Sequence, residues 1–373
     1  MLCPPSFECL RIGGKERVAL QLALRGREEG DDHRLLLFDT PCRSDIMDLN
    51  PGDVPTYYSR RKPGIDLTLP WRIRRVVQDT GACVVHAHND TAIFYGALAL
   101  LLDRHRPLKL VGTFHTRPTH GTWRARTATR WAAQTATYVT SVSDELTHHL
   151  RMTGWVSRCR TLWNGVDIEK FSPAGGTDNW RAHLSIPNSH LIVGHIGRMD
   201  PIKRQEDLLA AAEALSNKSH PLSFVLVGQG PDSQNLAIQA SRSKNVHFIP
   251  NLPDVPAFLR SLDIFVICSD HEAAPMVLLE AMSCGRAIIA THVGGIPSMM
   301  TGDDGKVCGL LIPPRRPDLL AESIEVLASS RDLRTELGRL ARFRAEQFSF
   351  DRQWAEYLEI YSAGSRSGTT DLS

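Results

Sequence analysis

Residues 272–280 read EAAPMVLLE, and the two acids that end this stretch decide how the chain is interpreted. The stretch follows a short apolar run that predicts a strand. Pro275 suits the first position of a helix, where a backbone N–H is not needed, and Gly285 is placed to end that helix. We therefore expect Glu272 on the loop at the carboxyl end of a strand and Glu280 on the helix that follows.

Both acids are expected to serve one ligand. In open α/β sheets, ligands bind in the crevice beyond the carboxyl ends of the strands. An ionised carboxylate only accepts hydrogen bonds, so two carboxylates at one crevice suit a ligand that is rich in hydroxyl groups.

The length of 373 residues indicates two domains, and the hydrophobic content of 42% is enough to form real cores. No run of eighteen apolar residues occurs, and the first residues lack the pattern of a secretory signal. The eight cysteines include no Cys-x-x-Cys pair, which argues against zinc and against a disulfide scaffold. We expect a cytoplasmic protein in a reducing compartment.

The net charge of +2 hides an asymmetry between the two halves of the chain. Residues 1–170 hold 24 Lys and Arg against 18 Asp and Glu, whereas the remaining residues hold 19 against 23. The segment from Arg104 to Val142 contains seven basic residues and no acid. It is either an ordinary solvated face or a surface attracted to an anionic membrane or a pyrophosphate-bearing lipid. Nucleic acid is not expected as a partner, because no reader motif accompanies the charge.

Short β-rich runs alternate with helical patterns along the whole chain, which predicts parallel sheets covered by helices on both faces. The turn-rich stretch 164–188 is the best domain boundary. We expect two doubly wound, Rossmann-like domains that face each other across a cleft. The predicted domains are residues 1–168, joined by a C-terminal helix at about 351–373, and residues 169–350.

The first strand is unusual. Few residues precede the first turn, and Pro4 and Pro5 cannot lie in a central strand. Either this strand is truncated or the natural start lies upstream, and we expect the first domain to be weakened.

A phosphate-binding loop is predicted after the apolar run Leu191–Ile196. Gly197 permits close backbone approach, Arg198 and Lys203 supply positive charge, and a helix begins directly afterwards. Arginine grips phosphate oxygens in a bidentate way, while lysine acts as a point charge. Alone, such a loop could equally be surface charge; the nearby acid pair favours phosphate binding.

Two glycine pairs resemble this design. Gly13 and Gly14 precede the first helix, and Gly294 and Gly295 follow a predicted strand. Each pair alone could be plain turn chemistry.

Other motifs are incomplete. Gly228-Gln229-Gly230 follows a strand, but Ser233 breaks the dinucleotide fingerprint. His86 and His88 are interpreted as strand-end packing rather than as metal ligands. No Asp-x-Asp sequence occurs, so we expect no metal and no cofactor, with the cation role taken by Arg198 and Lys203.

These segments together resemble retaining glycosyltransferases of the GT-B fold, glycosyltransferase family 4. The resemblance runs from residue 12 to about residue 360. It rests on IGGKERVALQLA, VVHAHN, GTFHT, SVSDEL, WNGVDIEKFSP, VGHIGRMDPIKRQEDLL, VLVGQGP, HFIPNLPDV and DHEAAPMVLLEAMSCGRAIIATHVGGIP. It implies that the last helix crosses back onto the first domain.

The resemblance also implies roles for individual residues. The catalytic set comprises Glu272, His115, Arg198 and Lys203, with Glu272 on the sugar hydroxyls and His115 over the sugar. The donor-binding set adds Glu280 on the ribose and, through backbone or close contact, Gly13, Gly14, Gly197, Ala274, Pro275, Met276 and Val277.

Three positions depart from the family pattern. Ala273 stands where glycine is usual, Ser298 where an acid is common, and Pro250 where glycine is common, so nucleobase contacts near Pro250 are in doubt.

The predicted function is transfer of a hexose-type sugar from a nucleotide-diphosphate donor to a glycan or lipid-linked acceptor, in envelope polysaccharide or lipopolysaccharide synthesis. Two alternatives stay open: a nucleotide-sugar 2-epimerase and a non-catalytic nucleotide-sugar-binding subunit. The sequence does not distinguish the nucleotide, the sugar or the acceptor. The predicted location is the cytoplasm, with peripheral contact at the inner face of the plasma membrane as a further expectation.

Overall fold

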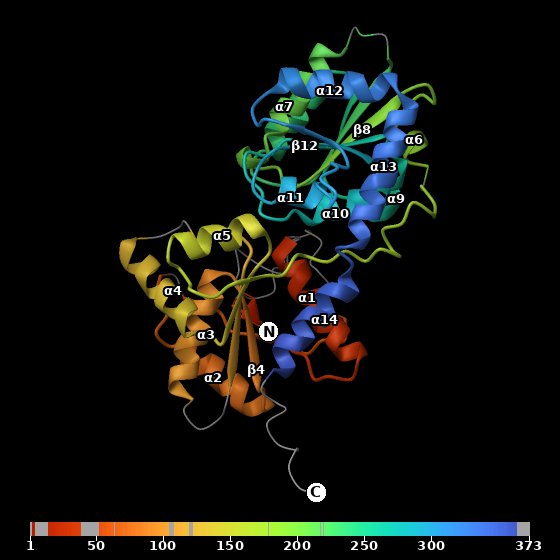
Figure 1. The fold of residues 1–373 in the computed structure, drawn as a ribbon. Helices are drawn as coiled ribbons and strands as arrows, with labels where there is room; N and C mark the ends of the chain where they lie inside the picture. Colours follow the sequence, from red (N-terminus) through yellow and green to blue (C-terminus); the bar gives the residue numbers. More distant parts are fainter. Residues whose placement is uncertain are drawn as a thin grey trace, which may run out of the picture. The chain divides into compact units, whose positions relative to one another are not determined.

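The computed structural model describes residues 2–3, 14–38, 52–62, 64–103, 108–118, 122–177, 179–216, 218 and 220–363. The chain divides into two compact units (Figure 1). Unit 1 comprises Met1–Asn164 and Gln353–Ser373, and unit 2 comprises Gly165–Arg352. Each unit is described by itself.

Unit 1 contains a parallel sheet with the strand order β3-β2-β1-β4-β5-β6-β7. Its strands are β1 (Leu2–Cys3), β2 (Leu35–Leu37), β3 (Thr56–Tyr58), β4 (Val84–His88), β5 (Lys109–Phe114), β6 (Tyr138–Ser141) and β7 (Arg160–Thr161). The order reverses between β1 and β4, because the chain first builds one side of the sheet and then the other. The predicted first strand is two residues long and pairs with both β2 and β4; Pro4 and Pro5 lie outside the described residues.

Helices connect these strands: α1 (Gly14–Glu28), α2 (Leu69–Thr80), α3 (Asp90–Leu102), α4 (Trp123–Thr135) and α5 (Asp144–Met152). The last helix, α14 (Phe350–Ser362), packs on the same sheet although it comes from the other end of the chain. Its Tyr357 hydroxyl lies 3.2 Å from Thr113 Oγ1, and its Tyr361 hydroxyl lies 2.7 Å from His86 Nδ1. The C-terminal helix therefore belongs to unit 1.

Unit 2 contains a parallel sheet with the order β10-β9-β8-β11-β12-β13. Its strands are β8 (Leu191–Ile196), β9 (Leu222–Val227), β10 (Val246–Ile249), β11 (Ile264–Ile267), β12 (Ala287–Thr291) and β13 (Leu310–Ile312). Strand β11 is apolar and buried along its whole length, and the inner residues of β8 are buried, as expected for a parallel sheet covered on both faces. The order reverses between β8 and β11, which is the arrangement of a doubly wound nucleotide-binding fold.

Helices cover the sheet of unit 2 (Figure 1). They are α6 (Trp180–His183), the 3₁₀ turn η1 (Pro201–Lys203), α7 (Gln205–Ala214), α8 (Ser233–Ala240), α9 (Val255–Ser261), α10 (Met276–Ser283), α11 (Ile296–Met300), α12 (Pro317–Ser329) and α13 (Arg331–Glu346). Side chains from the sheet and from α7, α12 and α13 form the main core, which includes Val193, Leu208, Val266 and Ile324.

Helix α10 begins and ends almost as the sequence predicts. Pro275 is the residue before the helix rather than its first residue, because its ψ of 120° is extended. At the other end Gly285 adopts a φ of +66°, and the N–H groups of Gly285 and Arg286 bond to the carbonyls of Met282 and Ala281. This pair of bonds satisfies carbonyls that the end of a helix leaves without partners.

Candidate active site

The site in unit 2 lies where the strand order reverses. The loop after β8 and the loop after β11 leave the sheet at neighbouring strands, at their carboxyl ends. A crevice forms at this point in doubly wound sheets, because the connections on either side run to opposite faces. The first loop carries Arg198 and Lys203, and the second carries Glu272.

The start of the first loop is held against the loop after β9. Gly228 has a φ of +143°, and a Cβ atom there would lie 1.9 Å from the Gly197 carbonyl oxygen. A Cβ atom on Gly230 would lie 2.1 Å from the Met199 carbonyl oxygen, and the Met199 N–H donates to the Gln229 carbonyl at 3.0 Å. Gly228 and Gly230, the two glycines of the incomplete fingerprint, therefore leave room for the backbone of the loop after β8.

The backbone of Arg198 is held by a hydrogen bond, whereas its long side chain faces solvent. Its carbonyl accepts a hydrogen bond of 2.8 Å from Nε2 of Gln205, which is buried and also lies 3.3 Å from Nε2 of His195. Its side chain is 60% exposed, and Nε lies 3.7 Å from Oδ2 of Asp200. The structure thus places Arg198 on the predicted loop, but does not bring its side chain into contact with Lys203 or Glu272.

Lys203 and Glu272 do meet. Lys203 ends the η1 turn, and Asp200 caps the start of this turn, because its Oδ1 accepts a hydrogen bond from the Ile202 N–H. Lys203 Nζ lies 2.5 Å from Glu272 Oε1, and Ser269 Oγ donates to the same oxygen at 2.8 Å. Both donors converge on one oxygen, and both ionised side chains are largely shielded from solvent.

Hydrogen bonds to main-chain carbonyl groups hold the two loops side by side. The Asp270 N–H donates to the Ile202 carbonyl at 2.8 Å, and Cys268 Sγ donates to the Lys203 carbonyl at 3.3 Å. Because Cys268 is buried, its pKa is raised and the thiol stays protonated. The separation between Lys203 and Glu272 is therefore set by the backbone as well as by their own attraction.

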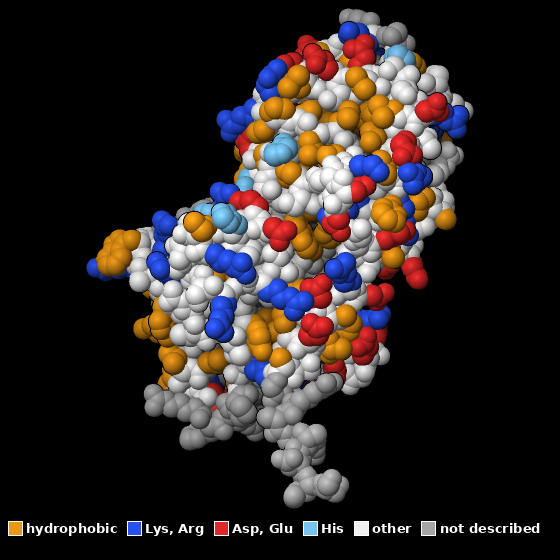
Figure 2. Space-filling model, viewed as in Figure 1, with side chains coloured by type: hydrophobic (Ala, Val, Ile, Leu, Met, Phe, Trp, Pro, Cys, Tyr) orange, Lys and Arg blue, Asp and Glu red, His pale blue; other side chains and the backbone are white. Residues whose placement is uncertain are grey.

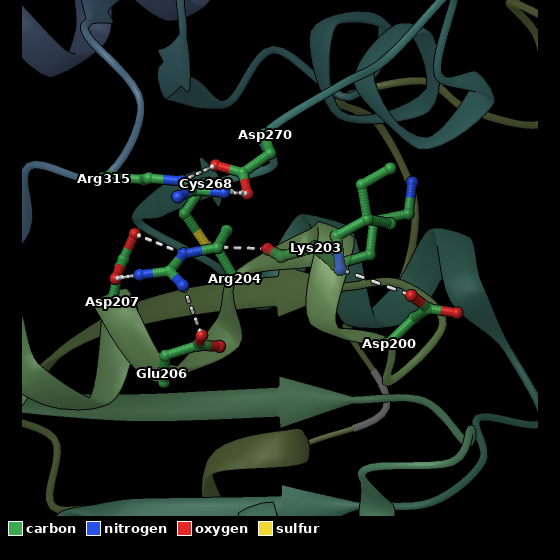
Figure 3. Close-up of polar contacts among 9 residues, drawn as sticks. Asp200, Lys203, Arg204, Glu206, Asp207, Cys268, Asp270 and Arg315 are labelled. Atoms are coloured by element: carbon green, nitrogen blue, oxygen red, sulfur yellow. Dashed lines mark hydrogen bonds and ion pairs between the residues drawn. The ribbon is translucent and has the colours of Figure 1, made fainter.

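A second group of charges borders these loops (Figure 3). Arg204, with a φ of +54°, lies between the carboxylates of Glu206 and Asp207. Arg315 pairs with Asp270 through two nitrogens, and this hydrogen bonding lowers the pKa of the Asp270 carboxyl. The sequence did not single out these residues or Ser269; for Ser269 and Asp270, their position just after β11 was the available signal.

The start of α10 carries the remaining residues that were predicted to contact a donor. Ala274 and Met276 are buried, Pro275 and Val277 are partly buried, and Glu280 is 1% exposed on the body of the helix.

Gly294 and Gly295 support Glu272 directly. A Cβ atom on Gly294, whose φ is +53°, would lie 1.6 Å from the Glu272 carbonyl oxygen, and the Gly295 N–H donates to that oxygen at 3.2 Å. This glycine pair therefore fixes the backbone that carries the acid.

Unit 1 has its own group of polar residues at the carboxyl ends of β4 and β5. His115 follows β5, and its Nε2 lies 2.9 Å from Nδ1 of His88 at the end of β4. Burial, together with the charge of Lys15, lowers the pKa of His115 to about 3. Gly14 begins α1 and is exposed, Lys15 Nζ lies 3.4 Å from Glu16, and Gly13 lies outside the described residues.

Within the part of the chain that the structure describes, no three His, Cys, Asp or Glu side chains are grouped in a way that could hold a metal ion. No helix among the described residues has the length and apolar character needed to cross a membrane.

Comparison with known proteins assigns both halves of the chain. Residues 12–170 match the family described as Glycosyltransferase Family 4, and residues 176–344 match Glycosyl transferases group 1. The chain is 32% identical over 216 residues to a D-inositol 3-phosphate glycosyltransferase of Saccharomonospora viridis, covering 54% of this chain and 49% of that protein. The corresponding protein of Salinispora arenicola is 31% identical over 225 residues, with coverages of 55% and 49%. The chain spans about half the length of these curated relatives.

Solved structures resemble the whole chain. A glycosyltransferase from Rickettsia africae ESF-5 superposes with a TM-score of 0.83 at 18% identity, covering 98% of both chains. HepE of Anabaena, solved in complex with UDP, gives a TM-score of 0.80 at 20% identity, covering 97% of this chain and 99% of that one. At such low identity these likenesses concern the fold, and they confirm the predicted α/β class with two Rossmann-like units of the GT-B type.

Proposed function

The chain belongs to the group 1 glycosyltransferases of glycosyltransferase family 4, and we propose that it is a retaining enzyme that transfers a hexose-type sugar from a nucleoside-diphosphate donor to a glycan or lipid-linked acceptor. The observation that carries this proposal is the contact between Lys203 and Glu272 where the strand order of unit 2 reverses. A cation and an acid side by side suit the two parts of a nucleotide sugar, which carries anionic phosphates next to a polyhydroxylated ring.

Each residue of unit 2 has a proposed task. Lys203 and Arg198 bind the diphosphate, and the exposed guanidinium of Arg198 can turn toward it from solvent. Glu272 accepts hydrogen bonds from sugar hydroxyls, and Glu280 accepts them from the ribose. The backbone N–H groups of Ala274, Met276 and Val277, at the start of α10, are proposed to add donors for the phosphate and the sugar.

The reaction breaks the bond between the anomeric carbon and the diphosphate oxygen, and the electron pair leaves with the diphosphate. The acceptor hydroxyl oxygen forms its bond to the anomeric carbon from the same face. The proton of this hydroxyl passes to a phosphate oxygen of the leaving group. Configuration is retained because the new bond forms on the face from which the diphosphate leaves. Lys203 and Arg198 stabilise the charge that grows on the diphosphate, and fixed cations of this kind need little reorganisation during the step.

His115 of unit 1 is proposed to contact the sugar, as the family resemblance implies. Burial keeps its imidazole neutral at physiological pH, because its pKa is lowered to about 3. No metal or cofactor has a part in the proposed reaction.

The acceptor side is proposed to include contact with an anionic membrane, at the inner face of the plasma membrane. Helix α4 supports this: Trp123 and Trp131 are 71% and 37% exposed, and Arg124 lies over the Trp123 ring at 5.4 Å. Figure 2 shows hydrophobic and basic side chains together over this helix. Exposed tryptophan beside arginine is typical of surfaces that bind membrane interfaces. Envelope polysaccharide or lipopolysaccharide synthesis is the proposed context.

The test starts with a thermal-shift screen against UDP-, GDP- and ADP-sugars, because a ligand that binds only the folded state raises the melting temperature. UDP-sugars are tested first, because HepE was solved in complex with UDP. The stabilising donor is then incubated with glycan, lipid-linked and inositol phosphate acceptors, the last because curated relatives carry that name.

The products separate the three classes of protein. A transferase releases nucleoside diphosphate in an acceptor-dependent way and forms a glycoside of the donor's anomeric configuration. A new sugar nucleotide formed without acceptor would identify an epimerase, and binding without turnover over the whole panel would identify a binding subunit. In the Glu272→Gln variant we expect turnover to be lost while the melting temperature stays near that of the wild type; transfer at the wild-type rate would contradict the site.

A further inference from the structure

Two consecutive residues of unit 1, His88 and Asn89, hold His115 at both its side chain and its backbone. Nδ1 of His88 lies 2.9 Å from Nε2 of His115, and the Asn89 Oδ1 atom accepts a hydrogen bond of 3.1 Å from the His115 N–H. The parallel pairing of β4 with β5 sets His88 opposite Thr113, so that the two strand ends meet at this point. The contact lies at the carboxyl edge of the sheet, beside the reversal of strand order in unit 1.

Asn89 holds His115 at some cost to its own conformation. It has a φ of +71°, which is unfavourable for a residue other than glycine. It also precedes helix α3, where an asparagine side chain commonly caps the first N–H groups, yet it makes no such bond. Its side-chain oxygen instead accepts from the His115 N–H, and strained residues of this kind are typical of functional sites.

The two imidazoles are both neutral. Burial lowers the pKa of His115 to about 3 and lowers the pKa of His88 well below its ordinary value. A neutral imidazole has one N–H donor and one bare nitrogen. In the bond between the two rings, therefore, one ring donates and the other accepts.

The surroundings of His88 decide the direction of this bond. Its second nitrogen, Nε2, is buried and has no hydrogen-bond partner among the described residues. If His88 accepted through Nδ1, its proton would sit on Nε2 as a buried donor without a partner, which is rare in proteins. If His88 donates through Nδ1, only a bare nitrogen is left unpaired, which is the milder defect. His88 therefore donates, Nε2 of His115 accepts, and the proton of His115 sits on Nδ1.

We propose that His88 and Asn89 are positioning residues that fix the backbone, the ring orientation and the Nδ1–H tautomer of His115. This inference rests on the proposed function, in which His115 contacts the donor sugar. The consequence is chemical: His115 presents an N–H group, so it acts as a hydrogen-bond donor to a sugar oxygen and not as a general base.

The tautomer is measured directly by NMR of the full chain with ¹⁵N-labelled histidine at pH 7.5, with His115→Gln to assign the signal. The expected pattern is a protonated Nδ1 and a bare Nε2 in His115. The same spectrum of His88→Phe, which keeps a ring but has no donor, should lose this pattern. A protonated Nε2 in wild-type His115, or an unchanged spectrum in His88→Phe, would overturn the proposal.

Kinetics test whether the tautomer matters for turnover. Loss of a group that orients a site residue costs roughly 10- to 100-fold, so His88→Phe should lower kcat by that factor with a donor KM within about twofold of the wild type. His88→Asn can place an amide N–H near the position of Nδ1 and should recover most of kcat. Asn89→Gly should also lower kcat, because it removes the bond to the His115 N–H. Glycine suits the positive φ at this position, so the variant should fold. It therefore tests the proposal even if His88→Phe fails to fold.

His86→Phe is the matched control. His86 lies on the same strand, stacks on His88 with ring centroids 4.1 Å apart, and bonds to Thr113 and Tyr361 rather than to His115. It should lower the melting temperature while kcat stays within about twofold of the wild type. Folded His88→Phe and Asn89→Gly variants with wild-type kcat would refute the positioning role. If the wild type transfers no sugar at all, the proposed function fails, whereas the NMR spectrum still decides the tautomer.

Discussion

The carboxyl edges of the two sheets have the same topology but opposite chemistry. In unit 2 the edge is ionic, with Lys203 against Glu272 and further pairs around Arg204 and Arg315. In unit 1 the ends of β4 and β5 carry neutral rings, because burial lowers the pKa values of His88 and His115, and the ion pair of Arg117 with Glu145 follows further along the edge. One doubly wound fold can thus present either fixed charges or uncharged hydrogen-bonding groups at the same place. A diphosphate needs the former, whereas a sugar ring near its reacting carbon is served by the latter.

The ionic edge should be the more sensitive of the two to a single substitution. Lys203→Met removes the cation that is proposed to meet the leaving diphosphate and leaves Glu272 without its ion-pair partner. We expect kcat to fall by about 10²- to 10³-fold, by analogy with the loss of one transition-state contact.

Steady-state kinetics with the donor found in the thermal-shift screen measure this effect. Arg315→Met is the control, because Arg315 pairs with Asp270 and has no proposed contact with the donor. Equal losses in the two variants would mean that general charge at this edge, and not Lys203 itself, is what matters.

The neutral edge should make unit 1 the more sensitive to acid. A buried histidine with a lowered pKa binds its proton only after unfolding, so stability is full above about pH 6.5 and falls as the pH drops toward the folded-state pKa. Each such histidine lowers the free energy of unfolding by up to about 1.4 kcal/mol for the first pH unit below its ordinary pKa. Burial lowers the pKa values of His33, His86, His88, His115 and His149 in unit 1, whereas in unit 2 it lowers the pKa of His195, to about 4, and that of His247.

Hydrogen exchange at pH 7.5 and at pH 5.5 measures the two units separately. Protection should fall further in β4 and β5 than in β8 and β11. Equal losses in both sheets, or a larger loss in unit 2, would contradict the assignment of neutral histidines to unit 1.

Gly294→Ala tests how strictly the ionic edge depends on its backbone. A Cβ atom would lie 1.6 Å from the Glu272 carbonyl oxygen, so the loop that carries the acid must move. We expect a loss of about 2 kcal/mol in stability, typical of overpacking, and weaker donor binding. Gly305→Ala is matched in conformation, with a φ of +77°, but has open space around it and should leave donor binding unchanged. Denaturant unfolding and donor titration separate the two variants, and equal donor affinity in both would refute the support that Gly294 gives to Glu272.

The smallest effect is expected from the outer ring of charges. Asp270→Asn weakens the pair with Arg315 but keeps the Asp270 N–H bond to the Ile202 carbonyl. Because Arg315 is exposed and water screens the pair, the loss in stability should be small. A much larger change in the unfolding midpoint would show that the side chain, and not the backbone, holds the two loops together.

The sequence predicted those elements whose signal is local. The bounds of β8 match the expected run Leu191–Ile196 to the residue, because a mostly apolar stretch between turn residues is a clear signal. Strands β3 and β7 were missed, since three and two residues carry too little periodicity to stand out. Glu272 and Lys203 were expected to share a site, and their contact follows from neighbouring strands ending at one edge.

The finer arrangement depends on contacts between distant residues, which local patterns do not encode. His88 and His115 lie 27 positions apart and meet only through the register of β4 with β5. In the same way, Gln205 holds the Arg198 carbonyl after the chain has turned through η1. His86 and His88 were interpreted as packing residues, and a single sequence gave no sign that one of them bonds to His115.

Peptide groups help to hold the loop of Lys203 in place: the Asp270 N–H bonds to the Ile202 carbonyl, and the Met199 N–H bonds to the Gln229 carbonyl in the loop after β9. Peptide groups are the same whatever amino acid occupies a position. Side chains on these loops can therefore be exchanged during evolution without disturbing the spacing on which the chemistry depends. At Gly228 and Gly294, in contrast, any side chain would place a Cβ atom against a neighbouring backbone oxygen, so these two positions tolerate little change.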